Sequence, residues 1–530
     1  MTATDHHRRL MLSFEGETVP PEVAQTLRSN DVAGVTLFRP HNYRTPEQFR
    51  ALNEELQRTA SGDLPLLIAI DQEGGQLHAF GAPATMWPGN MALGAADDND
   101  LTFRVGAAIG RELRAVGINV DYAPVADLAS NPLNPATGAR AFGDDPDLVA
   151  RHVKAIILGI QSEGVAATMK HFPGKGDSEV DSHHAMPTIS HGREHLEKNE
   201  FVPFRAAIDA DVKLAMTGHF ALPAVTGSDT LPCTLAWEAN TGLLRDEMGF
   251  EGAMITDAID MKALTQGGLQ IIDMIAAVTS GVDLLLLTAD AEQEERATVG
   301  LDFALSRRLI SESRMLEADD RVRALRTWVA GFPPIDIDQV GSARHAALAD
   351  EAAQRSITLV RNDAGLVPLT TTSDSKLLVV ETEMVNLTPA DTSGYEEPRL
   401  AAEIAEVVDA SVISVVVPHQ PSSTDIAGVF EAVRDSDIVI LGTAAAALAD
   451  KQASLVQAVL EAHDRVVVVA QRTPWDLMRF PDASTYLCSW SSNPASAKAV
   501  ARALAGLAPI TGKTPVTIGN IPSGTGIELA

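Results

Sequence analysis

Cysteine, positive charge and aromatic side chains are all scarce in this chain. Its 530 residues hold two cysteines, Cys233 and Cys488, which lie far apart and form no C-x-x-C pair. A disulfide framework and a zinc knuckle are therefore excluded. Lysine and arginine number 41 against 71 aspartates and glutamates, which gives a formal net charge of −30. Nucleic acids and anionic membrane surfaces repel such a protein, so we expect neither as a partner.

Long apolar runs are also missing. No stretch approaches the roughly 18 uninterrupted apolar residues that a membrane span requires. Residues 1–9 are mostly polar and offer no apolar core of a signal peptide. We therefore expect no membrane span and a cytoplasmic location.

Short apolar segments alternating with longer amphipathic ones dominate the first part of the chain. Such an alternation predicts parallel strands that are buried on both faces and connected by helices. Eight β/α units within about 330 residues are typical of a closed (β/α)₈ TIM-type barrel. We predict this barrel over residues 1–335. The eight apolar segments are residues 10–14, 34–38, 66–70, 118–124, 165–169, 212–216, 253–256 and 282–287.

A second domain is predicted over residues 336–530. Residues 331–336 contain Gly and two Pro and cannot continue a helix, so a linker is expected over 331–345. Further strand-like segments then recur between helical ones, which favours a smaller, open and mostly parallel α/β sheet. The Gly-, Pro-, Ser- and Thr-rich residues 511–530 are expected to run over a surface. The strand-like segments are residues 356–360, 376–380, 412–417, 438–441, 465–470 and 485–488.

Polar residues gather directly after five of the predicted barrel strands. In a (β/α)₈ barrel the carboxyl ends of all strands open onto one mouth, where active sites lie. Residues far apart in sequence are therefore expected to converge there. These residues are Asp71, Asp127, Lys170 with His171, His219, and Asp257.

Residues 170–184 form the densest polar segment, and their Gly, Pro and Ser content predicts a loop. A phosphate-binding P-loop is excluded, because Lys175 is followed by Gly176 instead of Ser or Thr. A second interpretation is a proton-transfer pair, in which Asp181 would orient the imidazole of His183 and stabilise its cation. A solvated loop with incidental histidines is a third. A metal site is a fourth, with the donors His171, Asp181, His183 and His184, although their spacing is not that of a zinc motif.

Several motifs resemble those of one known family, the glycoside hydrolase family 3 β-N-acetylglucosaminidases of the bacterial two-domain type. The resemblance covers most of the chain, and the motifs follow one another in the family's order. They are IDQEGG from Ile70, RAFGDDP from Arg140, KHFPGxGD from Lys170, DSH from Asp181, GFEGAMITDA from Gly249, SITL from Ser356 and LVPL from Leu366.

The resemblance implies roles for the matching residues. Asp257 would be the nucleophile of a retaining glycosidase and would form a covalent glycosyl-enzyme intermediate. His183 would be the acid/base, held by Asp181, in place of the second carboxylate that most retaining glycosidases use. The sugar's hydroxyl and N-acetyl groups would be bound by Asp71, Arg140, Lys170 and His171, with His219 near the site.

Elementary electrostatics agrees with these roles. Lys170 and Arg140 are expected to face Asp257 across the barrel mouth and to keep its carboxylate ionised, as a nucleophile must be. A histidine can donate a proton to the leaving oxygen and then accept one from the incoming acceptor. No metal and no organic cofactor is expected. Glu73 and Asp260 are expected to have structural or peripheral roles.

The chain departs from the family pattern at two positions. Lys175 stands where the family usually has His, and Ala79, beside His78, stands where it usually has Arg. Both changes touch the predicted sugar pocket or its rim. Lys175 adds a positive charge beside the acid/base loop, which leaves open phosphate as the acceptor and a glycoside phosphorylase as the function.

The leading expectation is an exo-β-N-acetylglucosaminidase that hydrolyses terminal β-linked N-acetylhexosamine from cell-wall or chitin fragments in the cytoplasm. Its partner would be a small carbohydrate, with inorganic phosphate as the alternative acceptor. A β-glucosidase and an inactive sugar-binding protein are further alternatives. The DSH motif argues against the first, and the presence of Asp257 and His183 argues against the second. All catalytic groups are expected in the barrel.

Overall fold

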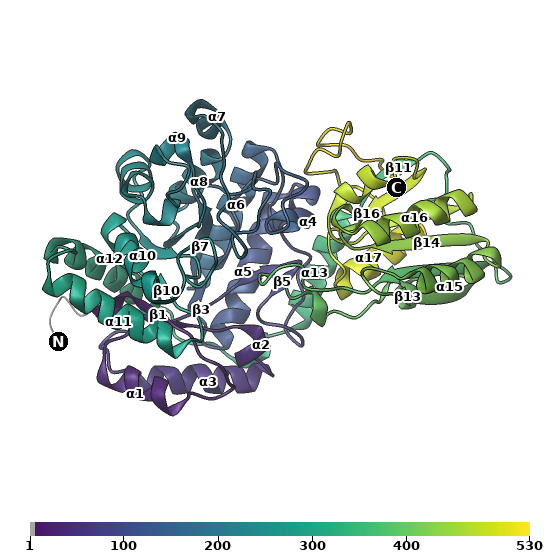
Figure 1. Cartoon of the computed structure of the whole chain (residues 1–530). Helices are drawn as coiled ribbons and strands as arrows, with labels where there is room; N and C mark the ends of the chain where they lie inside the picture. Colours follow the sequence, from purple (N-terminus) through teal and green to yellow (C-terminus); the bar gives the residue numbers. More distant parts are fainter. Residues whose placement is uncertain (1–5) are drawn as a thin grey trace.

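The structure, a computed structural model, describes residues 6–530 as two α/β domains. The barrel occupies the purple-to-teal half of the chain and the second domain the green-to-yellow half (Figure 1). Residues 1–5, on which part of the signal-peptide expectation rests, lie outside the described range. Within residues 6–530, no helix has the length and apolar character needed to cross a bilayer.

The eight predicted barrel strands are all present and pair in parallel. Their order in the sheet is β10-β1-β2-β3-β6-β7-β8-β9. A further parallel bridge joins Ile255 in β9 to Leu284, next to β10, and so closes the barrel. The (β/α)₈ prediction is therefore confirmed. The strands are β1 Leu10–Leu12, β2 Gly34–Thr36, β3 Leu67–Ile70, β6 Val120–Asp121, β7 Ala166–Phe172, β8 Leu214–Thr217, β9 Ala253–Thr256 and β10 Leu285–Leu286.

Side chains from most of the barrel strands pack together in the barrel interior. Met11, Ala69, Tyr122 and Ile255 belong to one buried cluster there. At Gly34 a Cβ atom would lie 2.4 Å from the carbonyl oxygen of Leu67, so only glycine fits between these neighbouring strands. This dense packing makes the barrel a solid support for the residues at its mouth.

Helices cover the outside of the barrel and several begin at side-chain caps. Asp98 accepts a hydrogen bond from the backbone N–H of Leu101 at the start of α5, and Asp145 does the same for Leu148 at the start of α6. The barrel-domain helices are α1 Pro21–Ser29, α2 Arg39–Asn42, α3 Pro46–Thr59, α4 Asn90–Ala96, α5 Asn99–Ala115, α6 Pro146–Ser162, α7 Arg193–Lys198, α8 Phe201–Asp209, α9 Pro223–Thr226, the π-helix η4 Glu238–Glu247, α10 Gln270–Ser280, α11 Ala291–Ser306 and α12 Glu312–Ala330.

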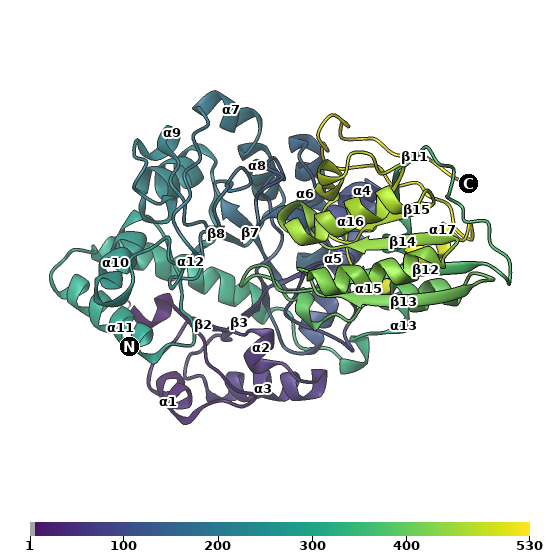
Figure 2. The same ribbon diagram turned by 45° about the vertical axis from the view of Figure 1, so that its right-hand side comes forward.

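The second domain contains a six-stranded sheet with the order β11-β16-β15-β14-β12-β13. All neighbours are parallel except β11 and β16, which are antiparallel, so the predicted mostly parallel sheet is confirmed. Figure 2 shows α15 and α16 side by side on one face of this sheet. The elements are β11 Thr358–Asn362, β12 Lys376–Thr382, α14 Leu400–Ala405, β13 Ser411–Val417, α15 Ser423–Arg434, β14 Ile438–Thr443, α16 Asp450–Ala462, β15 Val466–Ala470, β16 Thr485–Cys488 and α17 Pro494–Leu504.

Helix α13 (Ala343–Ser356) joins the two domains. It packs against α4 and α5 of the barrel and against α17 of the second domain. Its His345 contacts the buried Glu112 of α5 at 2.8 Å, and its Arg355 contacts Asp98 at 2.7 Å. The predicted linker 331–345 therefore ends inside a helix that both domains hold. The boundary at residue 335 stays a prediction.

The C-terminal segment differs from its prediction. Residues 511–530 were expected to run over a surface, but Val516 and Ile518 are buried. Lys513 donates a backbone hydrogen bond to Ala95 of the barrel, and Ile527 pairs with Leu359 of β11. The expectation is wrong for these residues, because composition alone does not show that a Gly- and Pro-rich segment has a groove between two domains to fill.

Candidate active site

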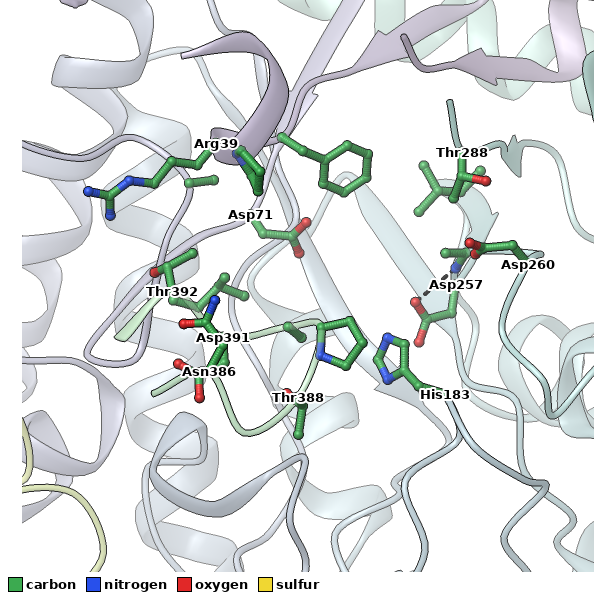
Figure 3. Close-up of a pocket in the computed structure, with 18 of the residues that line it drawn as sticks. Arg39, Asp71, His183, Asp257, Asp260, Thr288, Asn386, Thr388, Asp391 and Thr392 are labelled. Atoms are coloured by element: carbon green, nitrogen blue, oxygen red, sulfur yellow. Dashed lines mark hydrogen bonds between the residues drawn. The ribbon is translucent and has the colours of Figure 1, made fainter. Parts of the chain in front are cut away.

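A cavity of about 670 Å³ opens at the carboxyl ends of the barrel strands. Most of the residues predicted from sequence line it, which confirms that they converge in space. Figure 3 shows Asp71 across the cavity from Asp257, with His183 below. The predicted site residues on its wall are Asp71, Arg140, Lys170, His171, Lys175, His183 and Asp257.

Asp257 follows the last residue of β9 and points into the cavity. The backbone N–H of Ala258 donates to its Oδ1 at 2.9 Å, and Lys175 Nζ lies 3.9 Å from its Oδ2. Burial disfavours the charged carboxylate, but Lys175, the nearby imidazoles and the backbone N–H of Ala258 together outweigh burial and lower the pKa of Asp257. The side chain is therefore held ionised, as a nucleophile must be.

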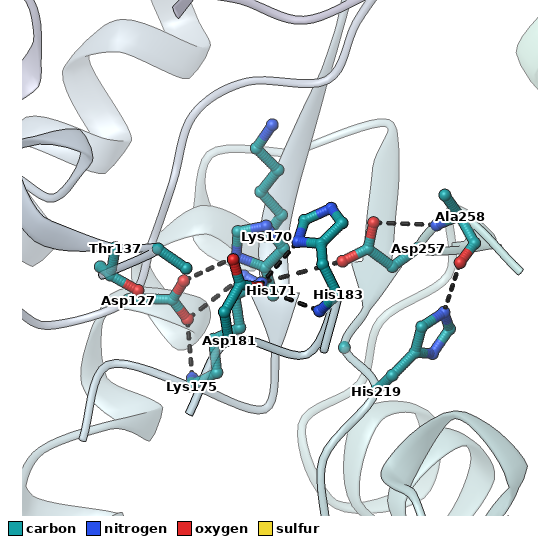
Figure 4. A network of polar contacts seen from close by, with 12 residues as sticks. Asp127, Thr137, Lys170, His171, Lys175, Asp181, His183, His219, Asp257 and Ala258 are labelled. Carbon is teal, nitrogen blue, oxygen red and sulfur yellow. Dashed lines mark hydrogen bonds and ion pairs between the residues drawn. The ribbon is translucent and has the colours of Figure 1, made fainter. Parts of the chain in front are cut away.

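The cation beside Asp257 is not the one predicted. Lys170 and Arg140 were expected to face this carboxylate, but both are engaged on the other side of the cavity. That expectation is wrong, and Lys175 takes the place (Figure 4). Lys175 is only 3% exposed, and burial lowers its pKa. An ammonium group shielded from water in this way interacts more strongly with the carboxylate of Asp257 than it would at the surface.

His183 and Asp181 form the predicted pair. The Nδ1 atom of His183 lies 2.7 Å from Oδ1 of Asp181, which also accepts the backbone N–H of His183 at 3.0 Å. Burial opposes ionisation of Asp181, but these hydrogen bonds lower its pKa to about 2. A charged Asp181 fixes the ring and leaves Nε2 as the nitrogen free to exchange a proton on the cavity side. Figures 3 and 4 both place His183 beside Asp257.

Glu73 is the centre of the opposite wall. Its carboxylate accepts two hydrogen bonds from Arg140, at 2.8 and 2.9 Å, and lies 2.5 Å from Lys170 Nζ. Lys170 also donates to Asp71 at 2.6 Å. Although burial opposes ionisation of Glu73, the two cations lower its pKa to about 2. The sequence predicts a structural role for Glu73 through bonds to the loop backbone, because neighbouring charges in a motif do not show which of them pair.

His171 and Asp127 form a second imidazole–carboxylate pair. Asp127 Oδ2 lies 2.7 Å from Nδ1 of His171, and its Oδ1 accepts the backbone N–H of Lys175 at 2.9 Å. Burial, together with the nearby positive charge of Lys175, lowers the pKa of His171 well below its usual value. A bulge in the pairing of β7 with β8 at Lys170–Phe172 lets two successive side chains, Lys170 and His171, reach the same cavity.

His219 lies behind the cavity wall, whereas Asp260 lies on it. His219 is fully buried and bonds Thr234 and the carbonyl oxygen of Ala258, so it supports the loop of Asp257 from below instead of lining the cavity. Asp260 is exposed and lies on the cavity wall. The cavity wall around its carboxyl group removes part of the surrounding water, and this desolvation raises the pKa of Asp260.

The metal reading of the loop is not supported by the geometry. His171 is bound to Asp127 and His183 to Asp181, so the four proposed donors do not converge on one point. Within residues 6–530, one group of three possible metal donors lies close together, and it contains none of these four.

A loop of the second domain completes the cavity. Residues 386–392, between β12 and η7 (Ser393–Tyr395), lie along its wall, as Figure 3 shows for Asn386, Thr388 and Thr392. Thr392 accepts the backbone N–H of His78 at 2.9 Å and donates its own N–H to Gln76 at 2.8 Å. These bonds fasten the loop to the hairpin β4 (Gln72–Gly74) and β5 (Leu77–His78) of the barrel. No sequence motif indicated this contact.

Asp391 is the one carboxylate that the second domain places on the wall, within the part of the chain that the structure describes. It is held by Arg472 at 2.7 Å and by the backbone N–H groups of Leu387 and Ser393. These bonds organise the loop itself. Within residues 6–530, the second domain therefore places no unpaired carboxylate on the cavity wall beside Asp257 and His183.

Arg39 compensates in part for the missing arginine at position 79. It lines the same cavity as Ala79, donates to the carbonyl oxygen of His78 at 3.3 Å, and stacks 4.4 Å from the ring centroid of Tyr395. Its guanidinium group approaches Gly81 so closely that a Cβ there would lie 2.4 Å from Arg39 Cζ. The rim of the site thus keeps a positive charge, supplied by a different strand end.

Comparisons with known proteins agree with this geometry. The description "Glycosyl hydrolase family 3 N terminal domain" matches residues 10–325, and "Glycosyl hydrolase family 3 C-terminal domain" matches residues 357–524. The chain belongs to glycosyl hydrolase family 3.

Three relatives illustrate the similarity. A β-hexosaminidase A of Pseudoalteromonas piscicida is 33% identical over 66% of this chain, and the match spans 63% of that protein's length. A β-N-acetylglucosaminidase/β-glucosidase of Cellulomonas fimi is 30% identical over 87% of this chain and 85% of its own. The solved structure of a family 3 β-N-acetylglucosaminidase from Paenibacillus sp. str. FPU-7 superposes with a TM-score of 0.91 at 32% identity, covering 98% of this chain and 99% of that one.

Proposed function

We propose that the protein is a retaining exo-β-N-acetylglucosaminidase. The observation that carries the proposal is the placement of an ionised Asp257, beside Lys175, next to the oriented His183–Asp181 pair in one cavity. A nucleophile and an acid/base on the two sides of a glycosidic bond are what a double-displacement mechanism requires. The names of the relatives from P. piscicida, C. fimi and Paenibacillus support N-acetylhexosamine as the sugar.

The first step breaks the glycosidic bond. A carboxylate oxygen of Asp257 attacks the anomeric carbon, and the bond from that carbon to the leaving oxygen breaks with both electrons going to the oxygen. The imidazolium form of His183, which Asp181 stabilises, donates a proton from Nε2 to that oxygen. The product of this step is a covalent glycosyl-Asp257 ester.

The second step releases the sugar. Neutral His183 removes a proton from a water molecule as the water oxygen attacks the anomeric carbon. The ester bond to Asp257 breaks, which restores the carboxylate, and His183 regains its proton. Lys175 stabilises the carboxylate as it leaves, because its ammonium group lies 3.9 Å from Oδ2.

The opposite wall would bind the sugar. Asp71 has one carboxylate oxygen on Lys170 and is partly exposed, so it can accept sugar hydroxyl groups. The donors around Asp71 are supplied or positioned by Arg140, Lys170 and His171. His219 contributes indirectly, because it bonds the carbonyl oxygen of Ala258. The natural substrates would be cell-wall or chitin fragments, cleaved in the cytoplasm.

A p-nitrophenyl β-N-acetylglucosaminide assay tests the proposal. We expect release of p-nitrophenol and free N-acetylglucosamine, and no turnover of the β-glucoside at a comparable rate. Turnover of the β-glucoside alone would contradict the sugar assignment. No turnover of either would contradict the enzymatic function and leave a sugar-binding protein.

Phosphate as the acceptor is the second candidate. The observation that favours it is Lys175, a buried cation on the cavity wall, together with a histidine acid/base that does not repel an anion as a carboxylate would. Adding inorganic phosphate to the same assay distinguishes the two. Formation of sugar 1-phosphate would establish a phosphorylase, and an unchanged rate with free sugar would establish a hydrolase.

A further inference from the structure

A cluster of metal-binding side chains lies outside the active site, at the far end of the acid/base loop. His191, His195 and Glu200 each place one donor atom within 4.8 Å of the other two. His191 lies two residues before α7, His195 lies on α7, and Glu200 directly precedes α8. None of the three lines the catalytic cavity.

Asp177 adds a fourth donor. Its Oδ2 lies 2.7 Å from Nε2 of His191, and the Nε2 atom of His195 lies 3.5 Å from Oε1 of Glu200. The imidazoles of His191 and His195 stack with their centroids 4.0 Å apart, which keeps the two rings side by side. The set of two imidazoles and two carboxylates is a donor combination that zinc accepts.

Glu200 provides an independent sign that a ligand is missing from the cluster. It is 2% exposed, and its Oε2 atom has no hydrogen-bond partner within the described residues. A buried carboxylate oxygen without a partner is costly, and a bound cation would remove that cost. Gly174 packs tightly against the base of the Glu200 side chain, where a Cβ on residue 174 would lie 3.0 Å from the Cβ of Glu200.

The donor atoms must move inward to accept an ion. Two donors at the tetrahedral angle around a zinc ion at about 2.0–2.1 Å lie about 3.4 Å apart. The widest separation in the cluster is up to 4.8 Å, and the side chain of His195 is 47% exposed and can move inward. The side chains of His191 and Asp177 are about one-third exposed, so an ion can enter from solvent.

We propose that Asp177, His191, His195 and Glu200 bind a zinc-class divalent transition metal ion that fastens the acid/base loop. Asp177 and His191 are the two ends of the segment 177–191, which contains His183 and Asp181. One ion would therefore tie both ends of this loop to helices α7 and α8 of the barrel. The ion takes no part in the reaction, and its binding does not depend on which sugar the enzyme cleaves.

Zinc titration of the chelator-treated full-length protein tests the proposal. We expect one Zn²⁺ per chain, measured by competition with a chromophoric chelator and by metal analysis after gel filtration. His195→Ala and Glu200→Gln should each weaken binding at least about tenfold. Glu194→Gln is the matched control on the same helix, because Glu194 pairs with Lys198 outside the cluster. Excess Mg²⁺ should not compete, since it prefers an all-oxygen shell.

Hydrogen exchange gives a second readout. Zn²⁺ should slow exchange over residues 177–191 in the unsubstituted protein and leave it unchanged in His195→Ala. His195 is half-exposed, so this variant should keep its fold even if Glu200→Gln does not. No saturable Zn²⁺ binding would overturn the proposal. Binding that His195→Ala leaves unchanged would also overturn it, because the ion would then lie elsewhere.

Discussion

Lys175 Nζ lies 3.9 Å from Oδ2 of Asp257, and within residues 6–530 no other lysine or arginine lies within 4 Å of that carboxylate. The cation that controls the proposed nucleophile is therefore carried by the same loop, residues 170–184, that contains His183. Lys175 is also one of the two positions at which the sequence departs from the expected family motifs. The departure from the family pattern and the electrostatics of Asp257 thus meet in one contact.

Replacing Lys175 with Met should change the pH dependence of the reaction. The pKa of Asp257 is lowered in the folded protein, so the carboxylate stays ionised until the pH falls to that lowered value. Without the cation that pKa rises, so the acidic limb of kcat/KM should move to higher pH by about one unit or more. Lys175→Arg keeps the charge and should leave the limb nearly in place. An acidic limb at the same pH in Lys175→Met would contradict this electrostatic role.

Asp257→Ala should separate binding from turnover. Removing the nucleophile prevents the glycosyl-enzyme from forming, whereas the sugar-binding wall around Asp71 and Lys170 stays intact. We expect turnover to fall by at least about 10⁴-fold, while calorimetry still detects binding of N-acetylglucosamine to the variant. Asp260→Ala is a control on the same wall and should lose far less activity. Substantial turnover in Asp257→Ala would rule out its assignment as the nucleophile.

His183→Ala should be most harmful with a poor leaving group. General acid catalysis contributes about 10²–10⁴-fold, and an aryl leaving group needs little protonation. The rate on a natural disaccharide should therefore fall much further than the rate on the p-nitrophenyl glycoside. Asp181→Asn should show the same pattern more weakly, because it removes the charge that orients the ring. Equal losses on both substrates would argue against His183 as the acid.

Much of the architecture is predictable from the sequence because parallel barrel strands are buried on both faces. Such strands read as unbroken apolar runs, and all eight appear in the structure. Polar residues that follow those runs must meet at one mouth, which explains why Asp71, Lys170 and Asp257 share a cavity. The family motifs added the identity of the reaction but not the pairings within the site.

The missed features are tertiary ones. Lys175, and not Lys170, lies beside Asp257 because of how a Gly-rich loop folds back. The spacing of residues in the sequence does not define that fold. The contact of Thr392 with the β4–β5 hairpin joins residues more than 300 positions apart and has no motif. The pairing of Glu73 with Arg140 and Lys170 is also a tertiary contact that the sequence does not show.

Glu73→Gln should destabilise the barrel strongly. The substitution would remove the negative charge that Arg140 pairs with and one of the two negative charges beside Lys170. Arg140 and Lys170 are only 4% and 1% exposed. Leaving buried charges uncompensated costs about 3–5 kcal/mol. Calorimetry at neutral pH should therefore show Tm lower by at least about 5 °C. Glu54→Gln, which breaks exposed pairs with Arg50 and Arg58, is the control and should change Tm little.

The effect of Glu73→Gln should also shrink in acid. The pKa of Glu73 in the folded protein is about 2, below the ordinary value of 4.5, so its stabilising contribution is complete above about pH 4.5. That contribution is lost as the pH falls toward 2. The Tm difference between the two proteins should narrow from pH 5 to pH 3. A constant difference over this range would mean that the network does not depend on the charge of Glu73.

Thr392→Val should test whether the second domain shapes the sugar pocket. The substitution keeps the side-chain volume but removes the acceptor for the backbone N–H of His78 and the donor to Gln76. Leaving a buried N–H without a partner costs about 1–3 kcal/mol, which should loosen the loop 386–392 from the barrel. Because this loop contacts neither Asp257 nor His183 by any hydrogen bond in the structure described, KM should rise several-fold while kcat changes little. The control Thr372→Val lies in an exposed turn of the same domain and should leave both constants unchanged. A fall in kcat with KM unchanged would instead mean that the loop acts on the chemical step.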